Sequence, residues 1–134
     1  MPDQRIQVPP NCELTLGMSC VDKAVPGRTV WRMRADERFS NPVGVIQGGF
    51  LAAICDSAMG AATVTWAEGA KIRAANAEMK ISFLRAARPG GFLTCSSRVV
   101  SAGSRVVFVE ADVTDDDGRL VAKASSTYLL SPRH

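Results

Sequence analysis

The sequence predicts a single α+β domain in which an antiparallel sheet of about five to six strands curls around one long helix. Two observations lead to this fold class. The stretch from about Gln47 to Trp66 is apolar, rich in helix-forming residues and too long for one strand. Strand-like segments lie on both sides of it, in the order two strands, one helix, four strands. The 134 residues fit one domain spanning 1–134, in which 1–12 are expected to be flexible.

The segments before the helix are predicted to be two strands, over residues 13–24 and 28–36, separated by a turn at "VPG". In "TVWRMRA", side chains alternate with a period of two, as in a strand. "RFSNPVG" is predicted to be a loop, because Pro42 favours an extended backbone at Asn41. The Gly pair that follows allows the start of the helix to lie very close to another group.

The segments after the helix are predicted to be four strands. In the first of them, alternation places Ala77, Met79, Ile81 and Phe83 on one face. The other three are "FLTCSSRVVSAG", "SRVVFVEADVT" and "RLVAKASSTYLL", joined by short turns that contain Gly. The run "DDDG" lacks the ligand spacing of a calcium loop and is interpreted as one of these turns.

The composition excludes several classes of partner. The net charge is +3, but the basic residues are scattered, so no nucleic-acid partner is expected. Gln47, Asp56 and several hydroxyl groups make membrane insertion of residues 43–66 costly. The N-terminus is polar and rich in proline, unlike a signal peptide. Four cysteines without metal-ligand spacing then indicate a reduced, cytoplasmic protein.

The chain also lacks the residues of several familiar catalytic sites. Its single histidine is His134, the last residue, which excludes a Ser–His–Asp triad, a Cys–His pair and a histidine-based metal site unless the terminus folds back. Neither Gly-rich nucleotide-binding motif occurs. Any acid–base chemistry is therefore expected to come from carboxylates, backbone groups and water, without a metal or cofactor.

Asp56 is the only charged residue between Phe39 and Ala67. One interpretation is a solvent-facing helical residue. The other is a catalytic acid in a closed site, acting as nucleophile or general base. The second is favoured because the neighbouring turns are apolar or small, whereas a solvent face carries more polar residues.

The stretch "NPVGVIQGGFLAAICDSAMG" resembles the helix-entry motif of hotdog-fold acyl-CoA thioesterases, in the PaaI-like (phenylacetic-acid-degradation) group of the 4-hydroxybenzoyl-CoA thioesterase superfamily. Asn41, Gly44, the Gly pair and Asp56 stand at matching positions, and "NAEMKISFLRAARPG" and "GRLVAKASSTYLL" are similar to strands of that group. Two positions differ. Gln47 stands where the group has His, and Asn76 where it commonly has Ser or Thr.

The resemblance implies a hotdog-fold enzyme that hydrolyses a small aryl- or acyl-CoA thioester to the free acid and CoA. Asp56 would be the nucleophile or general base, and the backbone N–H of Gly48 would stabilise the oxyanion. Asn41 and Gln47 would lie at the thioester, and Asn76 would hold a water molecule. The candidate substrate-binding residues are Gly49, Asn76, Phe50, Met59, Phe83, Arg85, Arg88 and Arg105.

Helix geometry predicts a homodimer. Gly48 and Asp56 are eight residues apart, which is about 12 Å along one helix, whereas both must reach one thioester. A two-fold dimer, paired further into a dimer of dimers, solves this by placing Asp56 of one subunit beside Gly48 of the other.

Two other functions stay open from the sequence. A non-catalytic acyl-CoA-binding or sensing protein of the same fold is supported by Gln47, which cannot carry a proton at neutral pH. A hotdog dehydratase would need a catalytic histidine, and the position of His134 makes this unfavourable.

Overall fold

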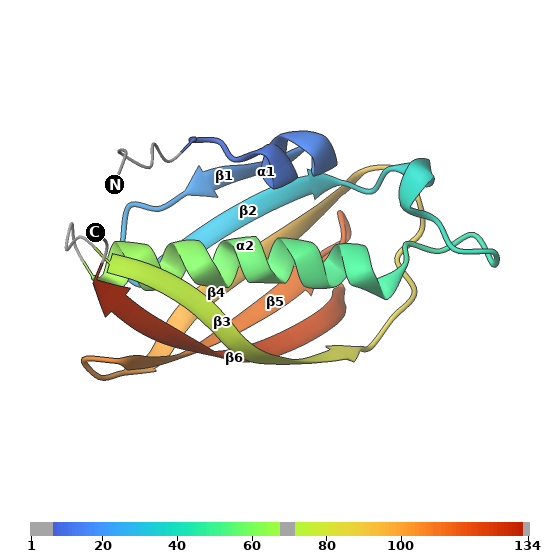
Figure 1. Cartoon of the computed structure of the whole chain (residues 1–134). Helices are drawn as coiled ribbons and strands as arrows, with labels where there is room; N and C mark the ends of the chain where they lie inside the picture. Colours follow the sequence, from blue (N-terminus) through green and yellow to red (C-terminus); the bar gives the residue numbers. More distant parts are fainter. Residues whose placement is uncertain (1–6, 68–71, 133–134) are drawn as a thin grey trace.

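A six-stranded antiparallel sheet curls around helix α2 in the computed structural model, which describes residues 7–67 and 72–132 (Figure 1). The strand order is β1-β2-β4-β5-β6-β3, so β3 and β1 form the two edges. The elements are α1 (Asn11–Leu16), β1 (Met18–Asp22), β2 (Arg28–Arg34), the 3-10 helix η1 (Glu37–Phe39), α2 (Gly48–Trp66), β3 (Ile72–Phe83), β4 (Phe92–Ala102), β5 (Val106–Thr114) and β6 (Leu120–Pro132). The predicted fold class and the order of strands and long helix are confirmed.

Helix α2 packs on the sheet through one apolar side. Its buried residues recur every three or four positions, as expected for one face of a helix. By length and composition alone α2 is apolar enough to cross a membrane, but in this fold that apolar side belongs to the core of the domain. The buried residues are Leu51, Ile54, Cys55, Ala58, Met59, Ala62 and Thr63.

Two buried hydroxyl groups hold the middle of α2 against the sheet. The backbone oxygen of Ala58 lies 2.7 Å from Thr29 Oγ1 and 2.8 Å from Ser97 Oγ, and the two hydroxyls are 2.7 Å apart. Thr29 comes from β2 and Ser97 from β4, where they pair in register. Because Ala58 follows Asp56 by two residues, this anchor also fixes the helical turn that carries Asp56.

A β-bulge interrupts the alternation of β3. Asn76 pairs with Tyr128 of β6 and Glu78 pairs with Thr127, which leaves Ala77 without a partner. Asn76 and Met79 consequently face the helix, and Ala77 is exposed. The prediction that Ala77 shares a face with Met79 was wrong, because a strict period of two does not allow for the extra residue.

The N-terminal part differs from the predicted strand over residues 13–24. Residues Asn11–Leu16 form α1, preceded by Pro10 and ended by Gly17 with a left-handed backbone (φ 69°). The strand begins only at Met18. Asn11 and Cys12 belong to this helix and not to a flexible segment, whereas residues 1–6 lie outside the described part.

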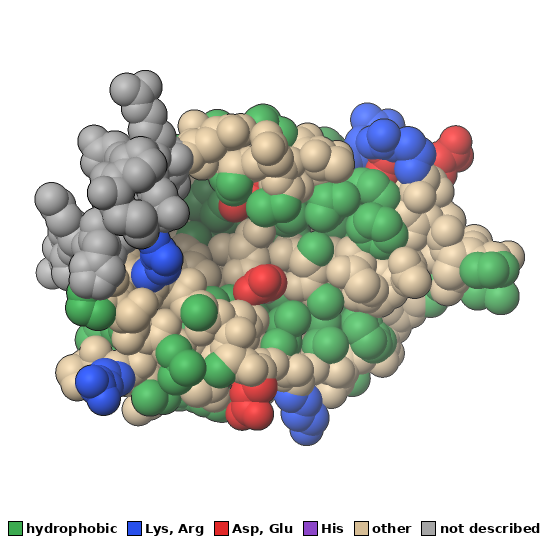
Figure 2. All heavy atoms as spheres, in the orientation of Figure 1, with side chains coloured by type: hydrophobic (Ala, Val, Ile, Leu, Met, Phe, Trp, Pro, Cys, Tyr) green, Lys and Arg blue, Asp and Glu red, His purple; other side chains and the backbone are tan. Residues whose placement is uncertain are grey.

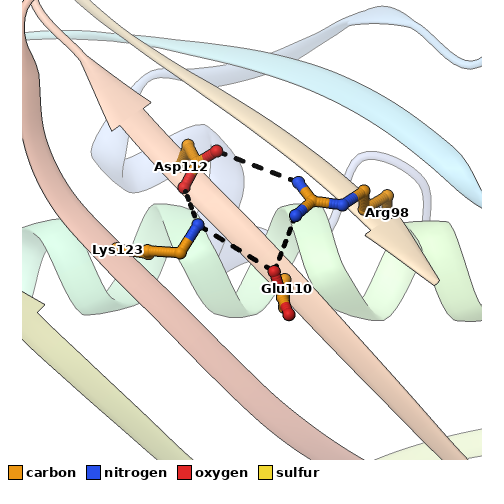
Figure 3. A network of polar contacts seen from close by, with 4 residues as sticks. All are labelled: Arg98, Glu110, Asp112 and Lys123. Carbon is orange, nitrogen blue, oxygen red and sulfur yellow. Dashed lines mark hydrogen bonds and ion pairs between the residues drawn. The ribbon is translucent and has the colours of Figure 1, made fainter. Parts of the chain in front are cut away.

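The outer face of the sheet carries a network of ion pairs (Figure 3). Arg98 of β4 contacts Glu110 of β5 at 2.7 Å, and Lys123 of β6 contacts Asp112 of β5 at 2.8 Å. Longer contacts of 3.8 and 3.9 Å join the two pairs. The same strands carry buried residues on their opposite face. One side of the sheet therefore faces water, and the other faces α2.

Candidate functional site

Asp56 lies at the edge of the buried side of α2, beside β3 and β6, and its side chain is exposed in the single chain. The expectation of a closed site is therefore not met within one chain. One carboxylate oxygen, Oδ1, nevertheless accepts two hydrogen bonds, from the Tyr128 hydroxyl at 2.6 Å and from Asn76 Nδ2 at 2.9 Å. This carboxylate is thus held in place by the sheet although solvent reaches it.

Sheet register brings the two donors to Asp56. Asn76 on β3 and Tyr128 on β6 are directly paired, and Asn76 faces α2 in phase with Ala74, before the bulge shifts the alternation. Asp56 and Asn76, which the family resemblance names as two candidate site residues, are therefore in hydrogen-bond contact.

Tyr128 is a site residue that the sequence analysis missed. It is 2 % exposed. Burial, and then the hydrogen bond to Asp56, raise the pKa of Tyr128 well above its usual value, so the phenol keeps its proton and acts as a donor. The only available sequence signal was that this is the single tyrosine of the chain, in a strand of small and apolar residues.

Asn76 has a further polar atom available. Its Oδ1 is buried and has no hydrogen-bond partner in the described part of the chain. The amide must present its NH₂ group to Asp56, since an ionised carboxylate only accepts hydrogen bonds. Its carbonyl oxygen thereby remains as an unused acceptor beside the carboxylate.

Gly48 is the first residue of α2, so its N–H has no carbonyl partner one turn earlier in the helix. A Cβ built on Gly48 would lie only 2.6 Å from Cζ of Phe83. The absence of a side chain is therefore what lets the Phe83 ring cover the start of the helix. Phe83 itself is 54 % exposed.

A hollow of about 390 Å³ adjoins this helix start. Predicted site residues from three segments line it, namely Asn41, Gly48, Phe83 and Arg85. The structure therefore brings the candidate oxyanion donor together with one candidate apolar contact and one arginine.

The two polar residues before the helix have different surroundings. The side-chain oxygen of Asn41 accepts hydrogen bonds from the backbone N–H groups of Val43 (3.1 Å) and Val45 (3.3 Å), so it shapes the loop. Gln47 precedes the helix, and its exposed side chain makes no capping hydrogen bond. Gly49 is also exposed.

The candidate apolar contacts do not gather into one acyl pocket in a single chain. Met59 is fully buried in the core beneath α2. Phe50 stacks on Phe39, with 4.3 Å between ring centroids. Only Phe83 lies at the helix start, so these three candidate substrate contacts do not line one pocket within a single chain.

The candidate arginines divide between the two ends of the sheet. Arg85 and Arg88 line a second hollow of about 420 Å³, which they share with Asp115, Asp116 and Asp117. Arg105 precedes Val106, which pairs with Leu129, whereas Phe83 pairs with Ala122. These two β6 positions are seven residues apart, or about 23 Å at 3.3 Å per residue. Arg105 therefore does not join Arg85 and Arg88 within one chain.

Comparisons with known proteins show the family and the fold of this chain. Residues 43–122 match the thioesterase superfamily. Human acyl-coenzyme A thioesterase 13 is 26% identical over 118 residues, which cover 87% of this chain and 83% of that protein. The structure of the Escherichia coli PaaI protein from the phenylacetic acid degradation operon superposes with a TM-score of 0.82 at 21% identity, over 88% of this chain and 82% of that one. A Streptococcus pneumoniae thioesterase protein solved with coenzyme A has a TM-score of 0.78 at 22% identity, over 87% and 88% of the two chains.

Proposed function

Since this chain belongs to the thioesterase superfamily, we propose that it hydrolyses a small aryl- or acyl-CoA thioester to the free acid and CoA, with Asp56 as its catalytic carboxylate. One observation carries this proposal. The only charged side chain of α2 is exposed to an incoming substrate, yet one of its oxygens is fixed by two donors from the sheet. Such a carboxylate is both accessible and oriented.

The chemistry requires an electrophilic carbonyl and a nucleophile. The carbonyl oxygen of the thioester accepts a hydrogen bond from the free N–H of Gly48, which also lies at the positive end of the helix dipole. Asp56 then either attacks the carbonyl carbon, giving an anhydride that water hydrolyses, or takes a proton from a water molecule that attacks directly. In both routes the carbon–sulfur bond breaks, CoA leaves as a thiolate that gains a proton, and the acyl group leaves as a carboxylate.

The surroundings of the two groups support this assignment. Asn76, whose Nδ2 lies 2.9 Å from Asp56 Oδ1, stands beside the carboxylate where the attacking water is proposed to be held. Phe83 and the hollow at the helix start provide room for the acyl group, and Arg85 and Arg88 in the adjoining hollow match the phosphates of CoA. Arg105 is the third candidate arginine for CoA, and because it lies at the far end of the sheet within one chain, it could act with Arg85 and Arg88 only from a second subunit.

The site is proposed to be complete only in a homodimer, either alone or as a dimer of dimers. Gly48 and Asp56 are about 12 Å apart along α2, so one thioester does not contact both within one chain. Strand β3 is a twelve-residue edge strand, which offers unpaired backbone groups to a second copy. The face that carries α2 and β3 is mostly neutral and hydrophobic (Figure 2), as expected for a surface that a second subunit covers.

A non-catalytic acyl-CoA-binding protein is the second candidate function, and Gln47 is the observation that supports it. An assay on a panel of acyl- and aryl-CoA thioesters separates the two functions. Hydrolysis of each thioester is measured as the loss of its absorbance. Turnover of at least one member supports the enzyme. Binding of CoA esters without turnover across the panel supports the sensor and overturns the proposed function.

Replacing Gln47 by His is expected to preserve folding and to keep turnover equal to or above that of the wild type. The side chain is exposed and makes no capping hydrogen bond, so an imidazole meets no steric obstacle. Steady-state kinetics on the same panel measure the effect, with Gln47→Ala as the matched control. Loss of all turnover in Gln47→His would mean that the amide has a specific role that this account lacks.

A further inference from the structure

We propose that Tyr128 is a positioning residue, which holds Oδ1 of Asp56 so that Oδ2 is the oxygen that attacks or takes the proton. This inference rests on the proposed function, in which Asp56 is the catalytic carboxylate. Tyr128 lies on β6, far in sequence from the helix-entry segment that carries the family resemblance.

The proton count around Asp56 fixes the direction of the hydrogen bonds. The Tyr128 hydroxyl has a single proton, and its oxygen lies 2.6 Å from Asp56 Oδ1, 2.9 Å from the Asp56 backbone oxygen and 3.4 Å from Asn76 Nδ2. Asn76 donates through its NH₂ group to both Tyr128 and Asp56. The Tyr128 proton therefore goes to the carboxylate, which is the closer and charged acceptor. The backbone oxygen belongs to the hydrogen-bond ladder of α2.

The phenol is a rigid donor because of its packing. Its ring is buried between the sheet and α2, and Gly60 lies against it, since a Cβ on Gly60 would be 3.6 Å from Tyr128 Cε1. A side chain held in this way keeps its hydroxyl at one point beneath Asp56. Water does not replace it easily at a position that is 2 % exposed.

The consequence for Asp56 is that its two oxygens are not equivalent. Oδ1 accepts hydrogen bonds from both Tyr128 and Asn76, whereas Oδ2 has no hydrogen-bond partner in residues 7–67 and 72–132. The two donors to Oδ1 restrict rotation of the carboxylate, so that Oδ2 remains the oxygen available to an approaching substrate.

Removing only the hydroxyl, in Tyr128→Phe, tests the positioning role in the full-length protein. We expect kcat to fall by about tenfold, the usual size of a charge-assisted hydrogen bond, while KM changes by less than about twofold. Ser126→Ala is the matched control, because Ser126 is a buried hydroxyl on the same strand that has no partner in the described chain. It is expected to leave kcat and KM unchanged.

A second readout uses no substrate. Tyr128 is the only tyrosine, so the absorbance of tyrosinate near 295 nm reports this residue alone. Asp56 raises the pKa of Tyr128, and Asp56→Asn removes the negative charge, so ionisation should begin at lower pH in this variant. Burial, the largest cause of the shift, remains. Tryptophan fluorescence identifies the pH range in which both proteins stay folded.

The outcomes separate this inference from the proposed function. Unchanged kcat in Tyr128→Phe overturns the positioning role. If the wild type hydrolyses no thioester, or Asp56→Asn keeps full turnover, the proposed function fails instead. A tenfold loss in Tyr128→Phe, together with the earlier ionisation in Asp56→Asn, supports the positioning role.

Discussion

Asp56→Asn is expected to lower kcat for thioester hydrolysis by about a thousandfold, within the range for loss of a general base. Asparagine has nearly the same shape and still accepts a hydrogen bond from Tyr128, but it neither attacks the carbonyl nor takes a proton from water. CoA-ester affinity is expected to stay within a few-fold of wild type. The unfolding temperature should be unchanged or slightly higher, because charged groups in active sites often lower the stability of the folded protein.

Asp112→Asn is the matched control for this variant. Asp112 lies on the outer face of the sheet, where it contacts Lys123 at 2.8 Å, on the side of β5 opposite to α2. Its loss should change stability by no more than about 1 kcal/mol, as for other exposed ion pairs, and leave kcat unchanged. Turnover in Asp56→Asn equal to wild type would contradict the catalytic assignment.

Gly48→Pro is expected to reduce kcat by a further factor of about a hundred relative to Gly48→Ala, because only proline removes the N–H donor. Both variants add a Cβ that displaces the exposed ring of Phe83. Proline suits the first helical position. The preceding residue, Gln47, already has the extended backbone that proline requires, with φ −62° and ψ 140°. The ratio of the two kcat values therefore measures the loss of the N–H together with the Cδ that replaces it, apart from the effect of the added Cβ.

Gly60→Ala controls for the effect of adding a methyl group to α2. At Gly60 a Cβ meets Tyr128 only at ordinary contact distances of 3.6 Å and above. This variant should unfold at an equal or higher temperature, since alanine favours a helix interior by about 1 kcal/mol over glycine. Equal kcat in Gly48→Pro and Gly48→Ala, with both folded, would show that the Gly48 N–H has no catalytic role.

Much of the fold follows from local sequence patterns. The long helix was predictable because its apolar run is too long for one strand and rich in helix-forming residues. The strands after it were predictable from alternation and from turns that contain Gly. The first helix was missed, although Pro10 before it and Gly17 after it are common helix boundaries. A six-residue segment gives too short a pattern to distinguish a helix from a strand.

The candidate site was only partly predictable, because it depends on register between distant strands. Asn76 and Met79 share a face only because a bulge lies between them, and Tyr128 reaches Asp56 because β6 pairs with β3 at Asn76. Neither fact is visible in local alternation. The same limitation explains why Met59 was taken as a candidate substrate contact. The sequence of α2 does not reveal which side of the helix enters the core, and Met59 lies on that side.

The measurement that tests the central claim most directly is complementation between Asp56→Asn and Gly48→Pro, each inactive alone. Equal amounts are unfolded and refolded together, and formation of mixed dimers is verified by mass spectrometry with one variant isotopically labelled. A site shared between subunits predicts that activity returns to roughly a quarter of wild type, because about half of the dimers are mixed and each has one intact site. If mixed dimers form and no activity returns, Asp56 and Gly48 do not act together across a subunit interface, and the account of a shared site is wrong.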